Sequence, residues 1–193
     1  MMKLRILVYS IIILAALVAC KDNSKLNGDQ NTGEESSSSD KQIEAPILVN
    51  QHVHAFSDPA KQDTFRITLT GDSVQTATVT FEIHNSKGER IYQEQFAAID
   101  LINYELPENA DPAAWDNFIL NRISTFFDEE HFVSPAIHSG MQLDSAYIDI
   151  EGWNDIKSNE ASIGFYFLLG KEDGRWLAYS KSQQKVVLYF NCC

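Results

Sequence analysis

The chain has 193 residues, of which 27 are Asp or Glu and 15 are Lys or Arg, so its formal net charge is −12. A field of this sign repels nucleic acid and anionic lipid surfaces, and we therefore expect no nucleic-acid partner. The charge is compatible with cationic partners, divalent ions or neutral glycans, and also with solubility alone.

The first 20 residues have the three zones of a secretory signal. A basic start with Lys3 and Arg5 precedes an apolar stretch over residues 6–17, and small residues then lead to Cys20. The apolar stretch is shorter than the roughly 20 residues that a helix needs to cross a bilayer. We therefore predict a signal peptide over residues 1–19 that is removed from the mature protein.

The sequence Leu17-Val18-Ala19-Cys20 resembles the lipobox of bacterial lipoproteins, and all four positions match. The resemblance implies a diacylglyceryl group on the thiol of Cys20, cleavage before that cysteine, and acyl chains such as palmitate as a membrane anchor. Each buried methylene contributes about 0.8 kcal/mol, so two or three chains hold a protein firmly. The alternative is an ordinary secretory signal, or an uncleaved anchor, that contains a cysteine by chance.

The residues after Cys20 bear on the location of the anchor. Lys21 stands where lipoproteins of the inner membrane often carry Asp, so the resemblance implies the outer membrane. Lys21-Asp22 is also similar to part of the export signal of small Bacteroidota-type surface lipoproteins, but Asn23 and Ser24 interrupt that signal. The periplasmic and the outward-facing orientation therefore both stay open.

Residues 20–45 form a polar segment after the lipobox. After the cysteine it consists mainly of Ser, Asn, Gly, Asp and Glu, and only Leu26 and Ile43 are aliphatic residues larger than alanine. Such a segment cannot bury enough apolar surface to offset the entropy of ordering. We predict a disordered acidic tether that spaces a single domain, residues 46–193, from the membrane.

Several segments of that domain alternate apolar and polar residues with period two, as half-buried antiparallel strands do. The alternation covers residues 65–70 and 76–83, with a turn at 71–73, and a further strand is expected from Glu89. The carboxyl-terminal segments 163–169, 175–180 and 185–190 also read as strands separated by turns. These patterns predict consecutive hairpins.

One amphipathic helix is predicted over about residues 111–127. Asp111 is a good cap acceptor, and Pro112 follows at the first helical position, where its missing N–H costs nothing. Apolar residues from Trp115 to Phe127 recur at helical spacing, so one face must be buried. We expect this helix to lie on a mostly antiparallel sheet in an α+β domain, with a second short helix over residues 152–158.

His52 and His54 are candidate metal ligands. Residues two apart on a strand project to the same face and can present two imidazoles to one ion. A third ligand must come from elsewhere, and Glu82 and His84 qualify only if their strand is a neighbour. The alternative is a histidine pair on a solvated strand. Apart from this divalent metal, no cofactor is predicted.

Residues 128–131, Asp-Glu-Glu-His, stand where the predicted helix ends. Carboxylates there face the negative pole of the helix dipole, so a bound cation would relieve the repulsion. In the alternative, the helix stops at Phe127 and the charges point into water. The spacing matches no calcium loop, which favours the alternative.

Cys192 and Cys193 end the chain in a compartment expected to be oxidising. Adjacent cysteines close a disulfide only through a strained ring. Two thiols, a disulfide to another chain, a thiolate metal ligand, and burial as a small hydrophobe all stay open.

The sequence contains no G-x-S-x-G, H-E-x-x-H, P-loop, C-x-x-C or dinucleotide-binding glycine motif. Ser139 beside His138 is not a triad, because triads are defined by spatial geometry. No catalytic residue is therefore predicted, and we expect a protein without enzymatic activity.

The leading hypothesis is a lipid-anchored envelope protein that binds a protein, peptide or glycan. The alternatives are a metal-binding lipoprotein and an envelope hydrolase with a carboxylate pair, which needs a separation of roughly 5–10 Å. Aromatic residues outside the helix are candidates for ligand contact, although most should be core: Tyr147, Trp153, Tyr166, Trp176, Tyr179 and Tyr189. Tyr179 and Trp176 should point to opposite faces of their strand.

Overall fold

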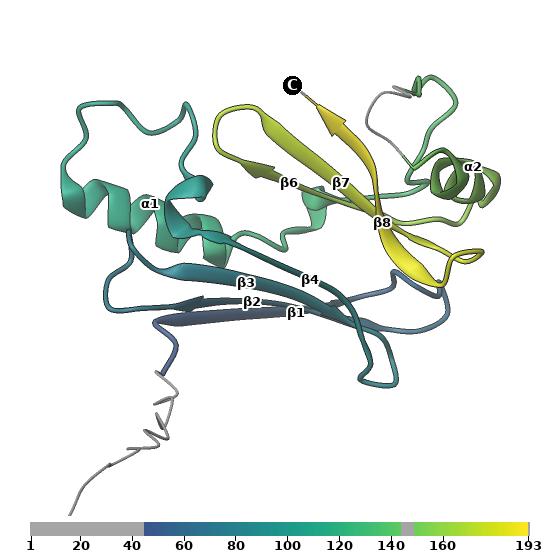
Figure 1. Cartoon of the computed structure of the whole chain (residues 1–193), viewed down its shortest axis with the longest axis horizontal. Coiled ribbons are helices and arrows are strands. Elements are labelled where there is room, and N and C mark those ends of the chain that lie inside the picture. Colours follow the sequence, from purple (N-terminus) through teal and green to yellow (C-terminus); the bar gives the residue numbers. More distant parts are fainter. Residues whose placement is uncertain (1–44, 144–148, 193) are drawn as a thin grey trace, which may run out of the picture. The chain divides into compact units, whose positions relative to one another are not determined.

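The computed structural model describes residues 45–143 and 149–192, which belong to one compact unit (Figure 1). The predicted signal peptide, Cys20 and nearly all of the tether lie outside these residues. In the described part of the chain, no helix is both long and apolar enough to cross a bilayer.

The first four strands form an antiparallel meander, sheet A, in the order β1-β2-β3-β4. Their bounds are β1 Leu48–His54, β2 Asp63–Thr70, β3 Thr78–His84 and β4 Arg90–Ala97. Every second residue of β2 and β3 is buried, which confirms the period-two prediction for these segments. Phe65 and Phe81 are among the residues on the inner face.

The remaining strands form a second antiparallel sheet, sheet B, in the order β5-β6-β7-β8. Their bounds are β5 Phe132–Val133, β6 Gly164–Leu169, β7 Asp173–Ser180 and β8 Lys185–Cys192. The predicted carboxyl-terminal hairpins are therefore confirmed. The last strand, β8, lies at an edge of its sheet.

Helix α1, Pro112–Ser124, begins as the sequence predicts. The carboxylate Oδ1 of Asp111 accepts a hydrogen bond from the N–H of Ala114 at 2.8 Å, and Pro112 is the first helical residue. The helix ends at Ser124, before the predicted end at Phe127. Phe126 and Phe127 are buried all the same, because the turn that follows the helix directs both rings into the core.

Six phenylalanine rings form the centre of the core between the two sheets. Their centroids lie 5.3 to 6.4 Å apart in edge-to-face, tilted and stacked pairs, which are favourable arrangements for aromatic rings. They come from both sheets and from the turn that follows α1: Phe65, Phe81, Phe126, Phe127, Phe165 and Phe167.

A second, smaller core lies between sheet B and helix α2, Ile150–Ser158, which confirms the predicted short helix. Trp153 and Ile156 of α2 are buried there with Tyr189 of β8. Figure 1 shows α1 over one part of sheet A, and α2 beside sheet B. Two further single-turn 3-10 helices are η1, Ala98–Leu101, and η2, Glu129–His131.

The α+β class is confirmed, but the strands divide between two sheets. After β4 the chain runs through η1 and α1 and returns as β5 at the edge of sheet B. The strands β5 to β8 pair only with one another, and the aromatic cluster lies between the sheets. The prediction was one sheet with α1 packed on it. In the structure, α1 instead shares its core with two sheets.

Replacing Asp111 with alanine should lower the free energy of unfolding by about 1 kcal/mol, because the N–H of Ala114 loses its acceptor. Urea denaturation followed by far-UV circular dichroism measures this change. Asn117→Ala, at an exposed position within the same helix, is the control and should have a smaller effect. Equal losses in both variants would contradict the capping role.

Candidate functional site

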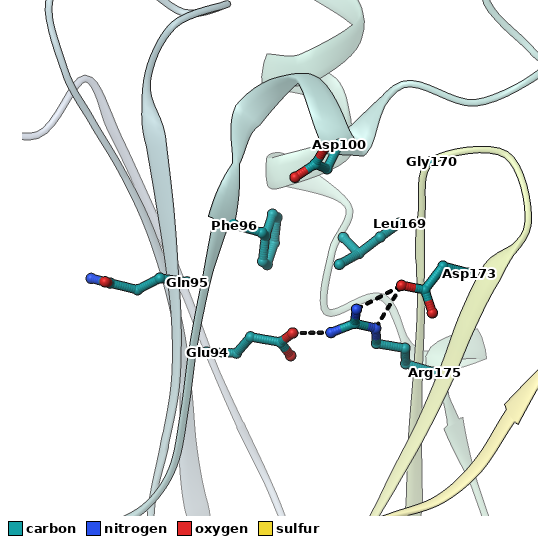
Figure 2. A pocket seen from close by; sticks show the side chains of 8 residues that line it. All are labelled: Glu94, Gln95, Phe96, Asp100, Leu169, Gly170, Asp173 and Arg175. Atoms are coloured by element: carbon teal, nitrogen blue, oxygen red, sulfur yellow. Dashed lines mark hydrogen bonds and ion pairs between the residues drawn. The ribbon is translucent and has the colours of Figure 1, made fainter. Parts of the chain in front are cut away.

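A pocket of about 440 Å³ lies between β4 and the β6–β7 hairpin (Figure 2). Glu94 of β4 and Arg175 of β7 point toward each other across it, whereas the side chain of Gln95 points away. Phe96 and Leu169 contribute apolar surface to the lining. We call this the β4–β7 pocket.

The charged groups of the β4–β7 pocket bind one another. Arg175 donates from Nη1 to Glu94, and from Nε and Nη2 to Oδ2 of Asp173 at 3.0 and 2.6 Å. The other carboxylate oxygens also have donors: Tyr92 Oη donates to Glu94 at 2.5 Å, and Asn191 donates to Asp173 at 3.2 Å. All four oxygens of the two carboxylates accept hydrogen bonds. The ion pair of Glu94 with Arg175 joins sheet A to sheet B.

Burial raises the pKa of Tyr92 from 10.0 to about 12, although the charge of Arg175 opposes the shift. Between pH 10.0 and about pH 12 the native protein keeps the Tyr92 hydroxyl proton, which the unfolded chain releases. The free energy of unfolding should therefore fall as the pH rises through this range. Urea denaturation at about pH 9 and about pH 11 should show a smaller loss for Tyr92→Phe than for the wild type. Tyr104→Phe, at an exposed ring, should change this loss less. Identical losses in the wild type and Tyr92→Phe would contradict the assignment.

A second pocket, also of about 440 Å³, lies where three hairpin turns meet. The turns join β1 to β2, β3 to β4 and β7 to β8, and Figure 1 shows all three at the same end. We call this the loop-end pocket. Its lining includes three lysines, two carboxylates, two side-chain amides and one aromatic ring: Lys61, Lys87, Lys181, Asp58, Glu89, Asn85, Gln184 and Tyr179.

Some donors in the loop-end pocket are not committed to other described residues. Lys61 forms an ion pair with Asp58 at 3.0 Å, but the ammonium groups of Lys87 and Lys181 pair with no described carboxylate. Burial raises the pKa of Tyr179, and the charges of Asp63 and Glu89 add to the shift, so its hydroxyl remains a donor at neutral pH. These groups are available to a polar ligand.

His52 and His54 lie on the inward-facing side of β1, at the edge of sheet A. Their neighbours Val49 and Val53 face outward instead and are 39% and 54% exposed. Asn50, on the same inward side, donates to the carbonyls of Ile123 and Ser124 at the end of α1. The histidines therefore lie on the side of β1 that faces α1 and η2, where their side chains are 31% and 23% exposed.

The carboxylate of Glu129 in η2 lies opposite both imidazoles. Its oxygens are 3.5 Å from Nε2 of His52 and 3.7 Å from Nε2 of His54. The ring of Phe132 stacks on His54 with a centroid distance of 4.0 Å. As the side chains stand, no three His, Cys, Asp or Glu residues within 45–143 and 149–192 form a group able to hold a metal ion.

Glu82 and His84, the third ligands suggested by the sequence, are not near the histidine pair. They lie on β3, which β2 separates from β1, and on the outer face of sheet A. Glu82 instead accepts from Arg90 at 3.1 Å. The third group beside the histidines comes from the acidic run, because the chain turns after α1 and brings Glu129 back over β1.

The acidic run itself does not extend a helix. Since α1 ends at Ser124, Asp128 and Glu130 are exposed outside it, and His131 uses Nδ1 to bind the carbonyl of Phe126 at 2.8 Å. The interpretation that the charges point into water therefore holds for Asp128 and Glu130, whereas Glu129 faces the histidines.

The other candidate residues are dispersed. Cys192 ends β8, half-buried beside Gly174, while Cys193, Tyr147 and Cys20 lie outside the described residues. Trp153 and Tyr189 are core. Tyr166 and Trp176 pack on each other with centroids 4.4 Å apart. Tyr179 and Trp176 contact different cores, which confirms their opposite orientation.

His138 and Ser139 line a third pocket, of about 590 Å³, with Lys157 and Glu160. Nδ1 of His138 accepts from the N–H of Gly140 at 3.2 Å, and in the described residues Ser139 forms no hydrogen bond with His138. The two residues are thus not arranged as a nucleophile and its base.

The loop-end pocket could not be identified from the sequence, because its lysines come from three separate turns.

Comparison with protein-family models, curated protein sequences and solved structures gives no match.

Proposed function

We propose that this protein is a lipid-anchored protein of the bacterial outer membrane whose domain binds an acidic glycan and does not catalyse a reaction. The zones of residues 1–19 and the match to the lipobox at Cys20 support the anchor. The acidic tether that follows supports a domain held away from the membrane.

The loop-end pocket is the observation that carries the binding proposal. In residues 46–193, 10 Lys and Arg stand against 21 Asp and Glu, yet three of these ten cations line this one pocket, against the two carboxylates of Asp58 and Glu89. A ligand with a carboxylate, as in a uronic acid, matches the uncommitted ammonium groups of Lys87 and Lys181. The ring and hydroxyl of Tyr179 offer a stacking surface and a hydrogen-bonding group of the kind that sugars use. The amides of Asn85 and Gln184 already donate to Glu89 and to the carbonyl of Lys181, so they shape the turns.

The β4–β7 pocket supports a binding protein over a hydrolase. A glycosidase needs one carboxyl group as an acid and another as a base or nucleophile. Glu94 and Asp173 already accept hydrogen bonds at every oxygen, with Arg175 between them. Such a pair suits the joining of two sheets.

Calorimetry with oligogalacturonate tests the binding proposal, using the mature protein in detergent. We expect Lys87→Ala and Lys181→Ala each to weaken binding by about tenfold to a hundredfold, since a charge-assisted hydrogen bond contributes about 1.5–3 kcal/mol. Lys171→Ala, on the distant β6–β7 turn, is the control and should leave affinity unchanged. Absence of binding, or equal loss in all three variants, would refute the site.

A separate experiment tests the anchor. Cells that express the chain are fed an alkynyl palmitate analogue, and the protein is then fractionated and probed for the label. We expect Cys20→Ser to abolish labelling and to release the protein from the membrane fraction, whereas Cys192→Ser should retain both. Membrane retention of an unlabelled wild-type chain would refute lipidation.

A further inference from the structure

We propose that His52, His54 and Glu129 bind a divalent transition metal such as Zn²⁺, with Glu129 as the third protein ligand. This site is separate from the loop-end pocket and does not depend on the proposed glycan binding. It joins two features that are far apart in the sequence, the histidine pair and the acidic run after α1.

His54 is held in the form that a metal ligand needs. Its Nδ1 lies 2.7 Å from the carbonyl oxygen of Ala55, which can only accept, so Nδ1 carries the proton. In the neutral ring, Nε2 then has a free lone pair. Imidazoles that bind metals commonly donate their other N–H to a backbone carbonyl in this way, because that bond fixes the ring and its tautomer.

His52 supplies the second, independent observation. Its Nε2 is buried and has no hydrogen-bond partner in the structure, although Oε1 of Glu129 lies 3.5 Å away. A buried polar atom without a partner is unfavourable, because it has lost its hydrogen bonds to water and gained none in the protein. A metal ion between this nitrogen and the carboxylate would satisfy both groups.

The distances from Glu129 to the two rings suit a bridging ion. Bonds of about 2.0–2.1 Å at tetrahedral zinc place neighbouring ligand atoms about 3.4 Å apart. The contacts of Glu129 with His52 and His54 are 3.5 and 3.7 Å, close to this value. The negative charge of the chain also favours a cation.

Binding requires the ring of His52 to turn toward that of His54. The two rings are stacked, with centroids 6.2 Å apart and planes inclined by 28°, and among the described residues no group of three ligands is in place as the side chains stand. The ring of His52 forms no hydrogen bond with another described residue and is free to rotate about its side-chain bonds, while His54 keeps its bond to Ala55. Glu129 is 77% exposed on a three-residue turn, so it can follow.

Titration of the mature protein with Zn²⁺ and with Co²⁺ tests the site. We expect one ion per chain by calorimetry and the intense visible bands of tetrahedral Co²⁺. Glu129→Gln should weaken metal binding at least tenfold. Loss of a group that only supports a metal ligand already weakens binding by about 10–100-fold, and Glu129 is proposed as a ligand itself. Because Glu129 is exposed, this variant should fold, and circular dichroism checks that it does.

Two matched variants separate this site from adventitious binding. Glu130→Gln removes the neighbouring charge of the same run, and His84→Asn removes a histidine on the outer face of sheet A; both should leave affinity unchanged. The proposal is overturned if no ion binds, if Glu129→Gln binds as the wild type does, or if Glu130→Gln weakens binding equally.

Discussion

Replacing Phe81 with alanine should lower the free energy of unfolding by about 3–5 kcal/mol. The ring is fully buried on β3, and it meets aromatic side chains from both sheets and from the turn that follows α1. Truncation removes these contacts and leaves a cavity. The surrounding rings belong to three different elements, so they cannot all shift inward to fill it. The loss should therefore lie in the upper part of the range for core truncations.

Urea denaturation followed by tryptophan fluorescence measures this loss. Thr80→Ala is the matched control, because Thr80 is the preceding residue of β3 and faces outward, where its hydroxyl accepts from Gln95 at 3.0 Å. It should cost less than about 1 kcal/mol. Similar losses for both variants would mean that the aromatic cluster is not the centre of the core.

Local patterns predict the elements of this fold because hairpins and caps depend on neighbouring residues. The alternation around Phe65 and Phe81 identifies the inner faces of β2 and β3, and Asp111 with Pro112 marks the start of α1. The division into two sheets is not predictable in this way. It depends on where β5 returns after α1, which is a matter of tertiary packing.

The histidine pair illustrates a second limit. Alternation places His52 and His54 on one face of β1, but it does not say which face is inward. The inner face here is the polar one, because β1 is an edge strand whose Asn50 binds the carbonyls at the end of α1. The approach of Glu129 depends on the turn after Ser124, and the sequence indicates a longer helix.

The loop-end pocket is beyond sequence analysis for a related reason. The amino-terminal hairpins bring Lys61 and Lys87 to one end of sheet A, and the last hairpin brings Lys181 to the same end of sheet B. Each lysine in isolation is an ordinary turn residue. Only the packing of the two sheets gathers them against the general negative charge.

Gly164→Ala should also be strongly destabilising, by about 1–3 kcal/mol. A Cβ atom at this position of β6 would lie 2.6 Å from Oη of Tyr189 and 2.9 Å from Val133, closer than real contacts allow. The Tyr189 hydroxyl cannot move freely, because it donates to the buried carbonyl of Ala136 at 2.8 Å. Glycine is therefore required here by close packing.

A double-mutant cycle with Tyr189→Phe tests this explanation. Tyr189→Phe alone should cost about 1–3 kcal/mol, since the carbonyl of Ala136 loses its donor. In the double variant the clash with Oη is gone. Its loss of unfolding free energy should therefore be smaller than the sum of the two single losses, by a coupling of at least about 0.5 kcal/mol. Urea denaturation of the four proteins measures this coupling. Additive losses would show that the methyl group added by Gly164→Ala clashes with Val133 and the backbone, and that the Tyr189 hydroxyl does not contribute to the clash.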